Sequence, residues 1–131
     1  KWINDSKATN PHAAQASLLA TNSSIWIAGG LAKGAHFDQL IERCKGRIKS
    51  AILIGTDRDL IAKELEKHKI EYFKVDSSNG NSVMEAAVKK ARELAEPGDT
   101  VLMAPACASM DQFKNYSDRG DQFVQAVKKF I

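Results

Sequence analysis

The sequence predicts an α/β fold in which a mostly parallel sheet is flanked by helices on both sides. Short apolar runs alternate with amphipathic stretches along the chain, as in successive strand–helix units joined by right-handed crossovers. Residues 25–28 and 51–54 are apolar at every position. Strands of that kind are typically covered on both faces, as in a parallel sheet. The expected architecture is therefore a Rossmann-like three-layer sandwich.

The strands are predicted at residues 2–4, 24–28, 50–54, 71–75 and 100–104. Asn10 before Pro11 predicts a helix over residues 11–20, because Asn caps free amides and Pro fits the first helical turn. Further helices are predicted from residue 36 or 37 to 43 and from residue 56 or 57 onward. Two more stretches have apolar residues at helical spacing. These residues are Met84, Ala87, Val88, Ala91, Leu94 and Ala95 in the first, and Phe123, Ala126, Val127 and Phe130 in the second.

The length of 131 residues suits one domain, predicted to span residues 1–131. The net charge is +3 and acidic residues lie among the lysines, so nucleic acid is not an expected partner. We find no apolar run of membrane-spanning length and no signal peptide, so a cytoplasmic location without a membrane partner is predicted. Cys44 and Cys107 lack metal-ligand spacing and are predicted to be reduced. The chain opens on a strand-like stretch without Met, as expected of a piece of a longer protein.

Three polar loops follow predicted strands and form the candidate ligand site. They cover residues 5–10, 29–34 and 105–111. The carboxyl ends of parallel strands meet at one edge of a sheet, and ligands of open α/β sheets bind beyond that edge. We therefore expect the three loops to lie together.

Two of these loops carry cations. In the first, Asp5 offers a carboxylate for a ribose diol, and Lys7 offers a point charge for phosphate or carboxylate. The alternative is a polar turn that only leads to the helix cap. In the second, a glycine pair at residues 29–30 lets backbone approach a ligand, and Lys33 can bind a carboxylate. The alternative for Lys33 is a solvated surface lysine.

The third loop predicts an anion seat at a helix start. Ser109 and Gln112 have the spacing of a capping box, and free amides at a helix N-terminus attract anions. The alternative is that Ser109 only caps its own helix. Arg119 can pair with an acid or with a ligand, and a structural salt bridge is the expected case. The histidines, which are expected in surface or capping roles, are His12, His36 and His68. No paired general acid and base is apparent, so no catalytic residue is predicted in this chain.

Taken together, these loops resemble the C-terminal domain of the D-glutamate-adding Mur ligases. The resemblance is carried by NDSKATN at residues 4–10, by the glycine pair with Lys33, and by PACASMDQFKNY at 105–116 followed by RGDQF at 119–123. It extends over essentially the whole chain. It implies the last domain of a three-domain, ATP-dependent ligase of peptidoglycan synthesis, which joins D-glutamate to UDP-MurNAc-L-alanine through an acyl phosphate. The P-loop and the Mg²⁺ ligands would lie in the central domain, and this domain alone would be inactive.

The resemblance also implies roles for individual residues. Nucleotide contacts fall at Asp5, on the ribose, and at Lys7. The implied D-glutamate contacts are Thr9, Lys33, Ser109, the backbone of Met110, and Tyr116, where the family often has Phe. A dicarboxylate needs two anion seats, which Lys33 with Thr9 and Ser109 with Met110 would provide. The alternative function is a non-catalytic, flavodoxin-like module that binds a small anion or a partner protein.

Overall fold

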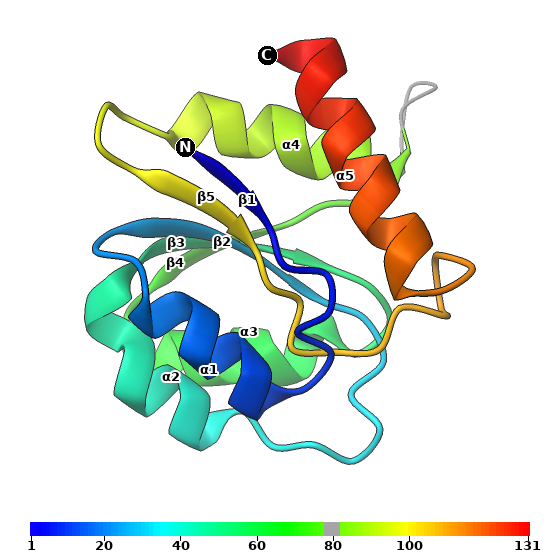
Figure 1. Ribbon diagram of the computed structural model, residues 1–131. Helices are drawn as coiled ribbons and strands as arrows, with labels where there is room; N and C mark the ends of the chain where they lie inside the picture. The colour runs from blue at the N-terminus through cyan, green and yellow to red at the C-terminus, as the bar shows by residue number, and fades with distance from the viewer. Residues whose placement is uncertain (78–81) are drawn as a thin grey trace.

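The computed structural model describes residues 1–77 and 82–131 and shows one sheet between two layers of helices (Figure 1). Five strands run in parallel in the order β1-β5-β2-β3-β4. Their bounds are β1 Trp2–Asn4, β2 Ser24–Gly29, β3 Ile48–Ile54, β4 Glu71–Lys74 and β5 Thr100–Met103. The predicted three-layer α/β fold is confirmed, and each predicted strand is present with ends shifted by at most two residues.

The helices are α1 Pro11–Leu19, α2 Asp38–Cys44, α3 Arg58–Lys67, α4 Val83–Leu94 and α5 Tyr116–Phe130, with a short 3-10 turn at Lys45–Arg47. Asn10 caps α1 as predicted, because its side chain accepts a hydrogen bond from the amide of Ala13 at 2.9 Å. The capping box in this protein lies at α4, where Ser82 and Glu85 bond each other's backbone amides.

The core is divided by the sheet into two apolar clusters. Successive side chains of a strand point to opposite faces. In β2, Trp26 therefore packs with the cluster under α1, α2 and α3, whereas Ile25 and Ile27 pack with the cluster under α4 and α5. Every residue of β2 is buried. This burial on both faces explains the unbroken apolar run from which the strand was predicted.

The chain leaves two neighbouring strands toward opposite faces. After β2 it enters α2 on one face, and after β5 it enters α5 on the other (Figure 1). A reversal of this kind between adjacent strands opens a crevice at their carboxyl ends, where open α/β sheets bind ligands. In the part of the chain described here, no helix has the length and apolar character required to cross a bilayer.

Candidate functional site

The three polar loops meet at the carboxyl edge of the sheet, as predicted (Figure 1). The amide of Ala106 donates to the carbonyl of Ala8 at 2.9 Å, which joins the third loop to the first. Leu31 and Ala108 form an isolated antiparallel bridge with two bonds of 2.9 Å, which joins the third loop to the second. We call the edge formed by residues 5–10, 29–34 and 105–111 the rim.

The glycine pair serves the contact between loops. The amide of Gly29 donates to the carbonyl of Pro105 at 2.9 Å. Gly30 has a φ of 141°, and a Cβ added to it would lie 2.2 Å from the carbonyl oxygen of Ala108. The sequence suggested that these glycines let backbone approach a ligand. In the structure, these glycines instead approach the backbone of β3 and of the third loop.

Arg119 holds the first and third loops together, and the predicted salt bridge is wrong. The guanidinium is fully buried and donates to the hydroxyl and the carbonyl of Ser6 at 2.8 and 2.7 Å, and to the carbonyl of Cys107 at 3.0 Å. Burial lowers the pKa of Arg119 to about 10. Its planar fork of donors suits several oxygens at fixed positions, which a lysine could not satisfy.

Ser109 does not begin a helix, and the capping box predicted there is wrong. Its carbonyl accepts from the amide of Phe113 at 3.0 Å, which closes a single turn. The helix α5 begins only at Tyr116, where the side chain of Asn115 accepts from the amide of Asp118 at 2.8 Å. An anion seat at Ser109 therefore has the amides of one turn to offer, without a helix behind them.

Asp5, Lys7 and Tyr116 line one hollow of about 250 Å³ between the first loop and the start of α5. Asp5 is half-buried and accepts a hydrogen bond from the hydroxyl of Ser17 in α1. The hydroxyl of Ser6 donates to the carbonyl of Tyr116 at 2.6 Å, which fixes the start of α5 against the loop. The structure thus brings together both residues predicted to bind nucleotide and one predicted to bind D-glutamate.

The other four predicted residues lie on the three loops of the rim. Thr9 is half-buried and next to Ala8, which bonds the third loop, while Ser109 is buried beside Ala108, which bonds the second. Lys33 is exposed and Met110 is 70% exposed. Lys33 has no ion pair or side-chain hydrogen bond within residues 1–77 and 82–131. The binding roles of all seven residues stay predictions.

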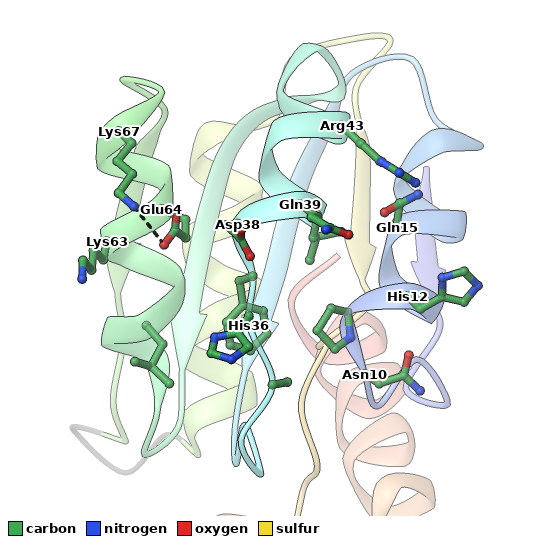
Figure 2. A pocket seen from close by; sticks show the side chains of 15 residues that line it. Asn10, His12, Gln15, His36, Asp38, Gln39, Arg43, Lys63, Glu64 and Lys67 are labelled. Atoms are coloured by element: carbon green, nitrogen blue, oxygen red, sulfur yellow. Dashed lines mark hydrogen bonds and ion pairs between the residues drawn. The ribbon is translucent and has the colours of Figure 1, made fainter.

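A larger hollow lies elsewhere on the surface (Figure 2). It measures about 860 Å³ and extends over α2 between α1 and α3. Its charged lining includes Arg43, Lys63 and the ion pair of Lys67 with Glu64, and it contains none of the seven predicted residues. Cations and carboxylates here face solvent and one another, so size alone does not make this hollow the site.

The histidines and cysteines lie outside the candidate site's chemistry. His12 and His36 are exposed, and His68 lies 3.2 Å from Glu42, so the predicted surface roles fit. Both cysteines are free and buried, as predicted. Burial raises the pKa of the Cys107 thiol to about 12, which leaves it protonated at neutral pH.

The comparisons with known proteins support the family resemblance that the sequences of these loops carry. A family model described as Mur ligase, glutamate ligase domain, matches residues 1–107. Over 129 residues the chain is 55% identical to the UDP-N-acetylmuramoylalanine--D-glutamate ligase of Streptomyces coelicolor. It is 48% identical over 135 residues to the protein of that name from Bifidobacterium adolescentis. These alignments cover 98% and 100% of the chain but 27% and 28% of the relatives, so the chain spans about a quarter of their length.

Proposed function

The chain belongs to the Mur ligase family, matching its glutamate ligase domain over residues 1–107, and we propose that it is the C-terminal domain of an ATP-dependent, three-domain ligase. The intact enzyme joins D-glutamate to UDP-MurNAc-L-alanine in the cytoplasm, for peptidoglycan synthesis. These relatives are named D-glutamate ligases, and the chain is about half identical to them over nearly its full length. This match favours a ligase over a non-catalytic binding module.

The observation that carries the proposal is the convergence of three loops on one rim. In the proposed site, Lys33 and Thr9 hold one carboxylate of D-glutamate, and Ser109 with the amide of Met110 holds the other. The hydrogen bonds of Ala8 to Ala106 and of Leu31 to Ala108 tie the loops that carry these residues side by side. A charge-assisted hydrogen bond to a carboxylate contributes about 1.5–3 kcal/mol. Two such seats suit an amino acid with two carboxylates better than a dipeptide.

The hollow beside Tyr116 is the proposed nucleotide contact. Its volume of about 250 Å³ fits a ribose, and the Asp5 carboxylate that lines it can accept from ribose hydroxyls. Lys7, also in its lining, would meet a phosphate. A Mg²⁺ ion held by this chain would require oxygen ligands from its residues. Within residues 1–77 and 82–131 no three His, Cys, Asp or Glu side chains gather as ligands, so we assign the metal no residue in this chain.

The domain's contribution to the reaction is positioning. ATP would transfer its γ-phosphoryl group to the carboxylate of UDP-MurNAc-L-alanine with release of ADP. The amine of D-glutamate would then attack the resulting acyl phosphate, form the amide and displace phosphate. Holding the amine in line with this carboxyl lowers the barrier of a bimolecular step without a proton-transfer residue. Closure of the domain over the nucleotide then excludes water, which would hydrolyse the acyl phosphate.

An acceptor panel with the full-length protein tests the function. Phosphate release from ATP with UDP-MurNAc-L-alanine should require D-glutamate, and L-glutamate, D-aspartate, L-lysine and L-alanine should replace it poorly. The product should be the D-glutamyl amide by mass spectrometry. Turnover that prefers another amino acid would make the protein a ligase of a different acceptor. An absence of turnover with every acceptor would contradict the ligase function.

The isolated chain provides the control. It should show no ligation and should bind ATP or D-glutamate weakly at most, because the two other domains complete both sites. Calorimetry that finds tight ATP binding by residues 1–131 alone would support the alternative of an independent small-anion or protein-binding module.

A further inference from the structure

A fourth loop, residues 55–57 between β3 and α3, contacts two of the three loops of the rim. The amide of Thr56 donates to Oδ2 of Asp111 in the third loop at 2.8 Å. Asp57 contacts the second loop twice, because its amide donates to the carbonyl of Gly30 at 2.9 Å and its Oδ2 accepts from the amide of Ala32 at 2.8 Å. We call residues 55–57 the bracket.

The approach of the bracket to both loops is close. Gly55 has a φ of 86°, and a Cβ added to it would lie 2.5 Å from the Cα of Gly30 and 2.8 Å from Oδ2 of Asp111. A residue with a side chain would therefore push both loops away. Gly55 therefore adds a third close contact to the direct bonds that Leu31 and Gly29 of the second loop make with the third loop.

The bracket fixes the backbone conformation next to Lys33. Lys33 has a φ of 50°, in the left-handed region that residues with a side chain seldom adopt. Such a conformation persists only where the surroundings impose it. The neighbouring Ala32 amide is bonded to Asp57, whereas Gly34 on the other side has open space around it. Asp57 is thus the side chain that anchors the loop next to the strained residue.

In the third loop, Asp111 makes the contact with the bracket, and it follows Met110 directly in the chain. Its Oδ2 is bonded to the bracket, while its Oδ1 is buried and has no hydrogen-bond partner within residues 1–77 and 82–131. An unpaired buried carboxylate oxygen costs stability. A local cost of this kind is expected where a side chain serves the geometry of a functional site.

We propose that Asp57 and Asp111 are positioning residues that fix the spacing between Lys33 and Ser109 through the bracket, and so select the acceptor by the distance between its two carboxylates. This inference rests on the proposed function, in which Lys33 and Ser109 bind D-glutamate. With the spacing fixed, D-aspartate, which is one methylene shorter, reaches one seat but not both. Neither aspartate contacts the acceptor in this arrangement.

The test compares Asp57→Ala with Asp57→Asn in the full-length enzyme. The alanine removes the acceptor for the Ala32 amide, so the KM for D-glutamate should rise about tenfold, the scale of one lost hydrogen bond to a charged group. The preference for D-glutamate over D-aspartate in kcat/KM should fall by about the same factor. The asparagine keeps an oxygen acceptor and should restore both values. The KM for ATP should change less than about twofold in either variant.

The matched control is Asp59→Ala, which removes the same charge two residues away. Asp59 is exposed on α3 and pairs with Lys74, away from the rim. It should leave KM and acceptor preference unchanged. Thermal unfolding reports whether each variant folds. Where Asp57→Ala does not fold, Asp57→Glu carries the test, because one extra methylene shifts the Ala32 amide, and an unchanged acceptor preference in it overturns the inference.

The two levels of the proposal fail differently. If Lys33→Ala leaves the KM for D-glutamate unchanged, the proposed binding roles fail. If Lys33→Ala raises that KM but Asp57→Ala alters neither KM nor acceptor preference, only the positioning inference fails. An equal rise in the KM values for ATP and D-glutamate would show a general structural role and would also overturn it.

Discussion

The two ends of the same sheet use their polar groups in opposite ways. At the amino end, the carboxylate of Asp99 accepts from Lys49 at 2.8 Å, from Ser23 at 3.1 Å and from the amide of Glu96 at 2.9 Å. At the carboxyl end, the loops of the rim are held by backbone bonds and by the side chains of Arg119, Asp57 and Asp111. The side chain of Lys33 has no partner within residues 1–77 and 82–131.

The difference separates stability from binding. A carboxylate with three donors is satisfied within the chain and contributes to folding. In the rim, backbone bonds and the side chains of Arg119, Asp57 and Asp111 fix the geometry, while the Lys33 ammonium stays available for a ligand. Substitution of Lys49 or Asp99 at the amino end should therefore alter stability alone, whereas substitution of Lys33 at the rim should alter the proposed binding of D-glutamate.

The largest difference in stability is expected between glycine-to-alanine substitutions at the two ends of the sheet. Gly30→Ala places a Cβ 2.2 Å from the carbonyl oxygen of Ala108, so it combines backbone strain with overlap and should destabilise by about 3–5 kcal/mol. Gly98→Ala, at the amino end, also has a positive φ of 95° but open space around it, and should cost about 1 kcal/mol. Urea unfolding measures both. Equal losses would contradict the close packing of the rim.

Arg119→Met should destabilise by about 3 kcal/mol, because three acceptors on Ser6 and Cys107 lose a buried donor. Arg119→Lys should recover only part of this loss, since one ammonium cannot reach all three oxygens. Chemical denaturation of both variants is the measurement. A loss below about 1 kcal/mol in the methionine variant would show that Arg119 does not hold the two loops together.

Asp99 should make the amino end sensitive to acid. Burial raises the pKa of Asp99, but the bonds from Lys49, Glu96 and Ser23 outweigh it and leave the pKa below its ordinary value. Its contribution is therefore full above a pH of about 4 and is lost as pH falls through the lowered pKa. Asp99→Asn should cost about 1 kcal/mol at pH 7 and less at pH 3. Urea midpoints that differ equally at both pH values would contradict this.

The smallest effect concerns Cys107, a buried residue of the rim. Its thiol is buried and its pKa is raised to about 12, so iodoacetamide at pH 8 should leave it unmodified in the folded protein. In urea the same thiol should react, which serves as the control. Rapid alkylation under native conditions, seen by mass spectrometry, would show that the rim opens readily.

The sequence predicted β2, β3 and β5 well because each contains a continuous apolar run. It did not predict the strand order β1-β5-β2-β3-β4, since β5 pairs with β1 and β2 through contacts between residues such as Trp2 and Val101 or Ser24 and Thr100, which are far apart along the chain. The placement of the three loops on one edge followed from parallel strands alone.

The errors in the site have a common cause. Ser109 and Asn115 both precede helix-forming stretches, and only the structure shows that Asn115 caps α5. Arg119 donates to the backbone carbonyls of Ser6 and Cys107, and backbone partners leave no pattern in the sequence. Asp57 was missed for the same reason, because its partner is the amide of Ala32. The charge of Arg119 suggested a charged partner, but Arg119 donates to backbone carbonyls. Asp57 likewise accepts from a backbone amide.

The binding rim is tested most directly by comparing Lys33→Ala with Lys49→Ala in the full-length enzyme. Lys33→Ala should raise the KM for D-glutamate by about 10- to 100-fold, as expected for a lost bond to a carboxylate, and should leave the unfolding midpoint unchanged. Lys49→Ala should lower the unfolding midpoint and leave that KM within about twofold. The same KM in both variants would contradict a carboxylate seat at Lys33.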